Sequence, residues 1–478
     1  MKDKKFKIYL YFCVAAFFIM SAVILYYSFG YKYSIDDGKT VQVGAIIVKT
    51  EPKKSDIYIN GEILKNNLLG DLFSDYVKIE NLNPETYNIK IEKNDYFTWE
   101  KNIEVKGGYI TELKNVVLLK NNYEKKILLN GIATGAEPNN IWASNNKNKI
   151  AYQKISNGKL NVFIFDLESE KQKMITDYIL PPKEYEDYYF DNIIWSDDDQ
   201  KIILKASSAN DDNKYSWYLI DLKNNNKTYK LNNIFGQKKE IKNKWNFHFD
   251  KSLLYLKNNA LYKLDYDKLV SKKFLENISS FSIIGDDIYY FETDDNTLYL
   301  TNYIKPDAAK NILTMPDNFN SNLPSKIIKS GKNTYLVLSD SGNLYFVNEN
   351  NKITFINSFV KNAYFSNEDK RVVYSNDREI WVYYIGEKIS QPSKKEHTNE
   401  LVTRYSGTIS NIFLYKDNEH LFYKESDVFK FTELDNRDKI NIFDILKLES
   451  NNIFYSRNSN SIYYAENNKL IQIELDEE

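Results

Sequence analysis

Hydrophobic and polar residues alternate through most of this chain in short runs of about five residues, with Asp and Asn between the runs. The stretch 192–230 shows the pattern best, with apolar runs that include 201–205 and 217–222. Alternation with a period of two, and Asp or Asn at the corners, predicts four antiparallel strands joined by hairpins. A four-stranded sheet of this kind cannot bury both of its faces alone, so it needs further copies of itself to pack against.

Such copies recur through 124–478. Eight units can be aligned, and their first strands are NNIWAS, DNIIWS, KWNFHF, SSFSII, PSKIIK, KNAYFS, ISNIFL and SNNIFY. Their starts are about 35–53 residues apart, and longer loops absorb the difference because closure entropy grows slowly with loop length. Four short strands per unit at this period predict a β-propeller. Eight blades are favoured, and seven result if two of the more degenerate units are one.

The two ends of the repeat region complement each other. The eighth unit has strands near 453–455, 461–464 and 470–475, and it lacks a fourth strand. An isolated strand at 126–129 precedes the first unit and has no local partner. If this strand completes the last sheet, the ring closes and no exposed sheet edge remains there.

The units resemble TolB-like and WD-repeat propellers, most clearly at NIIWSDDDQKIIL. In this resemblance Asp197, Asp198 and Asp199 occupy the Pro-Asp-Gly turn of the TolB-like motif, without its Pro or Gly. No Trp-Asp dipeptide is present. The resemblance implies a binding platform, by analogy of fold.

The N-terminus predicts a membrane anchor. Residues 8–29 contain no charge, Pro or Gly, and about 22 helical residues span roughly 30 Å, the thickness of a bilayer core. Lysines within 1–7 place the short N-terminal tail in the cytoplasm and the rest of the chain outside, by the positive-inside rule. A cleaved signal peptide is the alternative, but the run is long and ends without a small-residue cleavage site. Residues 30–44 are predicted to form a stalk.

A small β domain is predicted at 45–120, where several alternating strands surround a Pro-containing turn and the Asn60-Gly61 tight turn. The segment resembles the PEGA domain, a family of small extracytoplasmic β-sandwiches. The resemblance is carried by Gly44, Pro52, Asn60-Gly61, Leu82-Asn83-Pro84, Tyr87, Tyr96, Trp99 and Leu118. The chain departs from the family pattern at Glu85 and Asp95, and LLGDLFSDY replaces its Thr-Pro pair. The resemblance implies a structural or recognition module without catalytic residues, and core packing is the favoured role of Tyr96 and Trp99.

Composition narrows the function. A net charge of −2 gives no electrostatic reason to expect a nucleic-acid partner. Abundant Tyr, Phe, Ile and Val favour an all-β fold. Cys13, the single cysteine, lies in the predicted anchor, so intrachain disulfides and extracytoplasmic cysteine chemistry are excluded.

Candidate metal ligands are few. His248, His397 and His420 show no metal-binding spacing, so a structural role is favoured for each. Acidic pairs fall where hairpin turns are expected and lack the spacing and glycine of a calcium loop, so solvated turns are favoured. These pairs lie within 197–199, 211–212, 286–287 and 294–295. No metal, cofactor or catalytic residue is predicted.

The sequence therefore predicts a single-pass protein of the cell envelope whose propeller binds a protein or an envelope polymer without turning it over. Insertions at 177–191, 206–214 and 386–400 are expected to extend a binding face, with Tyr185, Tyr188 and Tyr189 as contact residues. Packing of these tyrosines on a blade edge is an equal alternative. The rival function is a propeller hydrolase for polysaccharide or peptide, with carboxylates in the channel.

Overall fold

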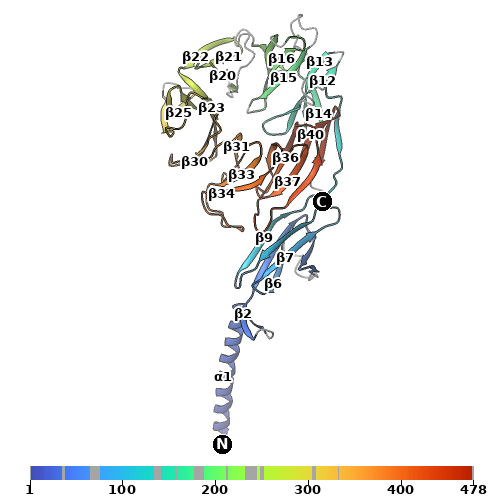
Figure 1. Cartoon of the computed structure of the whole chain (residues 1–478), viewed down its shortest axis with the longest axis vertical. Coiled ribbons are helices and arrows are strands. Elements are labelled where there is room, and N and C mark those ends of the chain that lie inside the picture. Colours follow the sequence, from blue (N-terminus) through green and yellow to red (C-terminus); the bar gives the residue numbers. More distant parts are fainter. Residues whose placement is uncertain are drawn as a thin grey trace.

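A computed structural model of the chain describes residues 2–34, 38–64, 76–133, 141–156, 159–176, 188–196, 198–211, 214–231, 245–247, 252–303, 308–323, 325–331 and 333–475. Apart from one helix, the elements of this part of the chain are strands. Figure 1 shows the three successive parts: a helix at the N-terminus, a small sandwich, and a ring of sheets.

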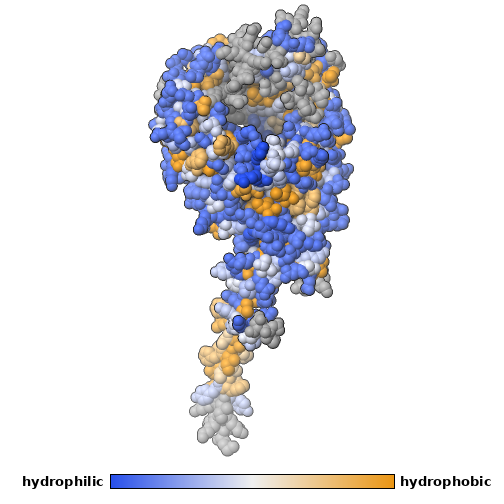
Figure 2. Space-filling view, in the orientation of Figure 1, coloured by the Kyte–Doolittle hydropathy of each residue, from blue (hydrophilic) through white to orange (hydrophobic). Residues whose placement is uncertain are grey.

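The helix α1 (Lys2–Ser28) includes an apolar stretch, Tyr9–Ser28, that is long enough to cross a membrane and contains no residue that the rest of the protein buries. Figure 2 shows its apolar side chains extending away from a mostly hydrophilic body. A hairpin of β1 (Tyr31–Ser34) and β2 (Lys39–Gln42) follows directly within the predicted stalk.

The sandwich consists of two sheets that share one apolar core, as predicted for 45–120. The first sheet has the order β6 (Val77–Leu82), β3 (Gly44–Glu51), β9 (Ile110–Val117), and the second β5 (Glu62–Ile63), β4 (Asp56–Ile59), β7 (Thr86–Glu92), β8 (Trp99–Glu104). Trp99 is buried in this core and Tyr96 packs against it, so their predicted packing role is confirmed.

The Asn60-Gly61 turn and the glycine at position 44 in the sandwich also have a structural basis. Asn60 and Gly61 both have positive φ, at 50° and 84°, as the tight hairpin turn between β4 and β5 requires. Gly44 begins β3, where the backbone of the connection between β8 and β9 passes closely. A Cβ there would lie 2.5 Å from the carbonyl oxygen of Lys106, so only glycine fits without displacement.

The ring contains eight four-stranded antiparallel sheets in the described part of the chain. Blades 1 to 4 are β11 (Ile141–Ala143), β12 (Lys149–Ser156), β13 (Lys159–Asp166), β14 (Lys171–Met174); β15 (Tyr188–Trp195), β16 (Lys201–Ser208), β17 (Tyr215–Asp221), β18 (Lys227–Lys230); β19 (Trp245–Phe247), β20 (Ser252–Lys257), β21 (Ala260–Asp265), β22 (Val270–Leu275); and β23 (Ile278–Ile284), β24 (Asp287–Glu292), β25 (Asp295–Asn302), β26 (Lys310–Thr314).

Blades 5 to 7 are β27 (Ser325–Lys329), β28 (Tyr335–Ser339), β29 (Leu344–Val347), β30 (Ile353–Asn357); β31 (Asn362–Phe365), β32 (Arg371–Ser375), β33 (Glu379–Tyr384), β34 (Asn399–Arg404); and β35 (Ile409–Leu414), β36 (His420–Glu425), β37 (Val428–Glu433), β38 (Ile442–Lys447). Blade 8 combines β39 (Ile453–Ser456), β40 (Ser461–Glu466) and β41 (Lys469–Glu474) with β10 (Lys126–Asn130). The favoured count of eight blades is therefore confirmed.

The predicted ring closure is also confirmed. Strand β10 pairs antiparallel with β41, so the chain segment before blade 1 supplies the outer strand of blade 8. Separate apolar cores join each pair of neighbouring blades, and one of them, which includes Leu129, Ile150 and Phe454, joins blade 8 to blade 1. Without β10, the outer edge of β41 would expose its backbone N–H and C=O groups, and the pairing with β10 covers them.

Candidate functional site

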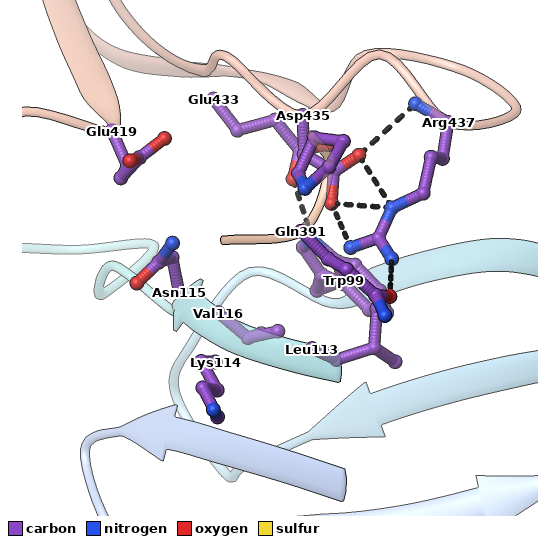
Figure 3. A pocket seen from close by; sticks show the side chains of 11 residues that line it. Trp99, Leu113, Lys114, Asn115, Val116, Gln391, Glu419, Glu433, Asp435 and Arg437 are labelled. Atoms are coloured by element: carbon purple, nitrogen blue, oxygen red, sulfur yellow. Dashed lines mark hydrogen bonds and ion pairs between the residues drawn. The ribbon is translucent and has the colours of Figure 1, made fainter. Parts of the chain in front are cut away.

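The sandwich meets the propeller at an interdomain junction that contains buried polar side chains (Figure 3). Trp99 and Lys101, on β8, reach Glu433 at the end of β37. The indole N–H of Trp99 donates to one Glu433 carboxylate oxygen over 2.9 Å, and the Lys101 ammonium lies 3.0 Å from the other. Lys101 has no exposed surface and Glu433 is 4% exposed. Asn441 completes the shell around Glu433 by donating from its backbone and its side-chain amide.

Two further side chains of the propeller bind the backbone of β9. Arg437 donates to the carbonyl of Glu112 over 2.9 Å, and the same guanidinium also binds the carboxylate of Asp435. Gln391 donates to the carbonyl of Ile110 over 2.8 Å and accepts from the N–H of Glu112 over 2.9 Å. In Figure 3 these groups converge on β9 from the loops of the ring.

The charges at the junction are balanced. Burial by itself raises the pKa of Asp435, but the hydrogen bonds and charge of Arg437, with the charge of Lys101, outweigh burial and lower that pKa from its usual value. The carboxylate therefore stays ionised beside its two cations.

Apolar contacts extend the junction on one side. Phe97 of the sandwich stacks on Phe443 of blade 7, with ring centroids 5.2 Å apart. Val117, Leu119 and Tyr123 belong to the same core as the buried aromatic residues of blades 7 and 8. Full burial of such a side chain contributes roughly 1.5–3 kcal/mol, so the three buried residues stabilise the contact strongly, and the partly buried Phe97 adds to it.

The cavity at this junction has a volume of only about 10 Å³. That is about the space of a single water molecule, so the junction does not hold a ligand of any size. Its geometry is that of a structural joint that keeps the sandwich and the propeller in one orientation.

A larger cavity, of about 340 Å³, lies where four blades come together. It is lined by Asn146, Lys147, Tyr364, Phe365, Asn367, Ile412, Phe413, Leu414, Tyr455, Arg457 and Asn458. These residues come from the first strands of blades 6, 7 and 8, and from the turns between the first and second strands of blades 1, 6 and 8. Blades 1 and 6 are not neighbours and meet only near the axis of the ring, so we call this cavity the channel mouth.

The guanidinium of Arg457 is held at the rim of the channel mouth by its neighbours in blade 7. Its Nη2 donates to the carbonyl oxygens of Tyr415 and Lys416 and to the side-chain oxygen of Asn418. Its Nη1 is buried and has no hydrogen-bond partner in the described part of the chain. The hydroxyl of Tyr364 is likewise buried and without a partner there.

The protonation of these groups favours donation. Burial raises the pKa of Tyr364, so its hydroxyl keeps its proton at any physiological pH. Burial lowers the pKa of Lys147, and the nearby carboxylate of Asp199 acts in the opposite direction. The channel mouth is therefore lined by the cations Lys147 and Arg457, and the unpartnered Nη1 of Arg457 and hydroxyl of Tyr364 are buried within its wall.

The histidines that the sequence singled out have structural contacts where they are described. His420 is buried, its Nδ1 is 2.6 Å from a carboxylate oxygen of Asp417, and its ring stacks on Phe431. His397 contacts the hydroxyl of Tyr383 over 2.6 Å. His248 lies outside the described residues.

The acidic turns fall where the alternation predicted them, but Asp199 is not solvated. It is 2% exposed, and its carboxylate accepts from the backbone N–H groups of Asn145 and Asn146 in the turn of blade 1. The prediction of a solvated turn was wrong for this residue because neighbouring blades bring their turns together. Asp197 and Asp212 lie outside the described residues. Within the described ranges, no group of three or more His, Cys, Asp and Glu side chains is arranged to hold a metal ion.

The three predicted binding insertions have different outcomes. Much of 177–191 lies outside the described residues, including Tyr185. Tyr188 packs against the core between blades 1 and 2, and its hydroxyl donates to the carbonyl of Leu160. In the insertion 206–214, residues 206–208 belong to strand β16 and the described residues that follow lie in the turn after it. Gln391, in the insertion 386–400, binds the sandwich, so that insertion makes an intramolecular contact.

Sequence reasoning missed Lys101, Lys147, Tyr364 and Arg457. One signal was present: the chain has five arginines among 64 basic residues, and a sparingly used Arg often has a fixed role. Three of the five have a buried or half-buried guanidinium that donates to carbonyl oxygens. They are Arg371, Arg437 and Arg457.

No protein-family model matches the chain, and no curated protein sequence matches it. Solved structures with similar folds include the β-propeller domain of Myceliophteria thermophila Cps50 (Swd1), with 10% identity, 74% of this chain and 100% of that chain covered, and a TM-score of 0.39. The Dos1 propeller has 13% identity, 74% and 95% coverage and a TM-score of 0.46. The tricorn protease has 12% identity, 73% and 33% coverage and a TM-score of 0.31. These scores are low, so the propeller assignment depends on the strand order itself.

Proposed function

We propose that this chain is a non-enzymatic, membrane-anchored binding or scaffold protein of the cell envelope. Helix α1 is the anchor, the PEGA-like sandwich is a fixed spacer, and the propeller recognises a protein or an envelope polymer. The observation that carries the proposal is the interdomain junction, where the buried Lys101–Glu433 pair and a shared apolar core join the sandwich to the ring.

The contacts at the membrane end support the same proposal. Tyr26 of α1 stacks on Tyr31 of the hairpin, with centroids 5.5 Å apart. Gln42 donates to the carbonyl of Phe29, and the N–H of Val43 donates to the carbonyl of Gly30. The helix therefore continues into the sandwich through a bonded hairpin. A propeller connected in this way is held in a set orientation to the membrane, as suits a display platform.

Orientation follows from charge. The lysines of the first seven residues precede the apolar helix, and the positive-inside rule places them in the cytoplasm. The propeller then faces the extracytoplasmic side. No family model matches the chain, so the PEGA assignment rests on the motif residues quoted above. Among these, Gly44 allows a close backbone approach, Asn60 and Gly61 form the tight turn, and Trp99 is buried in the core.

The test is site-specific photo-crosslinking of the full chain in its native envelope. A photoreactive residue is placed at Phe359, which is 78% exposed on one face of the ring, and at the exposed Asn458 on the other. The matched control is Tyr109 of the sandwich, which is 70% exposed. We expect a discrete adduct from at least one ring position and none from the control. An adduct from the sandwich position alone would contradict recognition by the propeller.

A parallel assay separates this proposal from the rival hydrolase. The purified full chain is incubated with envelope glycans and with peptides, and soluble products are measured. Turnover that is abolished by one carboxylate substitution in the ring, without any crosslinked partner, would establish the hydrolase and refute the binding protein.

A further inference from the structure

We propose that the channel mouth binds a carboxylate group carried on an apolar peptide segment of the propeller's partner. The proposal deepens the function proposed above and rests on it. The evidence is a cavity of about 340 Å³ with cationic and apolar lining and two buried donors without partners. The volume is in the range of roughly 300–1,000 Å³ that ligand pockets occupy.

The sign of the charge is the first argument. Lys147 and Arg457 line the channel mouth, and no carboxylate belongs to the lining that the structure describes. Several acidic groups of the neighbouring turns have other partners. Asp199 accepts backbone N–H groups, and Asp417 binds His420. Glu419 binds Arg371 and Lys388, at 2.7 and 2.9 Å. The Asp199 carboxylate lies near Lys147 but does not line the cavity, so an anion that enters meets two cations and no lining carboxylate.

The hydrogen-bonding capacity is the second argument. A guanidinium donates and never accepts, so the Nη1 of Arg457 needs an acceptor. A buried donor without an acceptor destabilises the protein, and the Tyr364 hydroxyl has the same deficit. Because Nη2 is fixed by three oxygens of blade 7, the guanidinium is already oriented before any ligand arrives. A carboxylate supplies two acceptor oxygens and a full charge, which makes the bond to a guanidinium stronger.

The walls of the channel mouth identify the rest of the ligand. Phe365, Ile412 and Phe413 are partly exposed and line it together with Leu414. An apolar wall gains nothing from the hydroxyl groups of a sugar acid or from inorganic phosphate, whereas it stabilises hydrocarbon at about 25 cal/mol per Å² buried. A peptide that carries Glu or Asp next to Leu or Phe has both features.

The experiment measures binding of fluorescein-labelled seven-residue peptides to the full chain in a neutral detergent. The first peptide has a central Glu flanked by Leu and Phe, the second has Gln in place of Glu, and the third keeps Glu but has Ser in place of the apolar neighbours. We expect the first to bind at least tenfold more tightly than either of the others. Glucuronate and inorganic phosphate are added as competitors, and we expect neither to displace it at equal concentration.

Variants then locate the site. Tyr364→Phe removes one hydroxyl and Lys147→Gln removes one charge, and we expect each to weaken binding of the first peptide threefold or more. Lys395→Gln, an exposed lysine of blade 6 outside the channel mouth, is the matched control and should bind normally. Neither variant touches the bonds that Arg457 makes to blade 7, so the ring stays folded, and circular dichroism checks this.

Each outcome decides the proposal. Equal binding of the Glu and Gln peptides overturns it, as does unchanged affinity in both variants. Displacement by phosphate or glucuronate shows that the anion does not come from a peptide and overturns the choice of ligand. If photo-crosslinking still captures a partner while no acidic peptide binds, only this inference fails. If neither is seen, the proposed function fails with it.

Discussion

Lys101 is the residue on which the arrangement of the two domains most depends. It has no exposed surface and lies between Glu433 and Asp435, at 3.0 and 3.6 Å from their carboxylate oxygens. An ammonium without water is stable only when such partners surround it. Replacing one member of the set therefore leaves buried charge uncompensated.

We predict that Lys101→Met destabilises the junction by about 3–5 kcal/mol, the usual cost of removing one partner of a buried ion pair. The melting temperature should fall, and trypsin should cleave the segment 118–125 faster. Lys114→Met is the matched control, because Lys114 is an exposed lysine of the same domain and its ion pair with Glu112 is partly solvated. A double variant, Lys101→Met with Glu433→Gln, should recover part of the loss. Equal melting temperatures for the two lysine variants would contradict this role of Lys101.

The His420–Asp417 pair predicts a dependence of stability on pH. Burial disfavours the charged imidazolium, but the charge and hydrogen bond of Asp417 outweigh burial and raise the pKa of His420 from its usual value of about 6.5. Burial raises the pKa of Asp417, but the charge and hydrogen bond of His420, with backbone N–H groups, outweigh burial and lower that pKa from its usual value of about 3.8. Glu433 and Glu419 add to the field that favours the protonated histidine.

The sign follows from linkage. A raised folded-state pKa of His420 means that its contribution is complete below the unfolded pKa of about 6.5 and is lost as the pH rises through the folded value. The lowered pKa of Asp417 means that its contribution is present above about pH 4 and is lost at lower pH. We therefore expect the melting temperature difference between the natural protein and His420→Gln to be greatest between about pH 4 and 6.5 and to shrink above that range. A melting temperature difference for His420→Gln that stays flat over this pH range would refute the assignment.

At the scale of elements, strand β10 is the part with the largest effect for its length. Its residues Lys126–Asn130 pair with β41, more than 300 positions later in the chain. Leu129 and the adjoining Ile132 belong to the core between blades 8 and 1. Closure of the ring therefore depends on a segment outside the repeats.

Deletion of 125–130 should lower the melting temperature clearly, because it removes several strand hydrogen bonds, worth about 0.5–1.5 kcal/mol each, and the burial of Leu129. Lys126→Ala, at an exposed position of the same strand, is the control. In addition, Lys126→Cys with Gln472→Cys, in a Cys13→Ser background, places two cysteines at opposed positions. We expect a disulfide that raises the melting temperature and is lost on reduction. An unchanged melting temperature after the deletion would show that β10 does not support blade 8.

At the scale of the whole molecule, the parts form a continuous series from the N-terminal helix to the ring. Figure 1 shows α1 at one end and the propeller at the other, with the sandwich between them. The hairpin of β1 and β2 bonds to the end of α1, and the interdomain junction bonds the sandwich to blades 6 and 7. Movement of the ring relative to the sandwich therefore requires breaking buried contacts.

The orientation proposed for this series is testable with intact cells. Protease added to spheroplasts should digest 31–478 and leave only the anchor segment, because the lysines before α1 retain the N-terminus in the cytoplasm. Detergent-permeabilised cells provide the control in which a cytoplasmic marker is digested as well. Protection of the propeller in intact spheroplasts, with digestion after permeabilisation, would reverse the assigned orientation.

The sequence alone determined the parts of this protein that depend on local order. The period of two and the Asp and Asn corners predicted the blades, because strands and tight turns are specified by adjacent residues. The surplus strand at 126–129 predicted the closure, because a blade without its fourth strand leaves an edge that must be covered. The apolar run near the N-terminus predicted α1, since its length alone fits a bilayer.

Only the tertiary structure decided what lies between these parts. Trp99 and Glu433 are 334 positions apart, and nothing near either residue in the sequence shows that they meet. The channel mouth gathers residues from four blades, and the burial of Asp199 depends on the turn of a neighbouring blade. Such contacts are set by how whole blades rotate and pack against one another. That geometry is a sum of many weak, non-local interactions, and it leaves no periodic pattern along the chain.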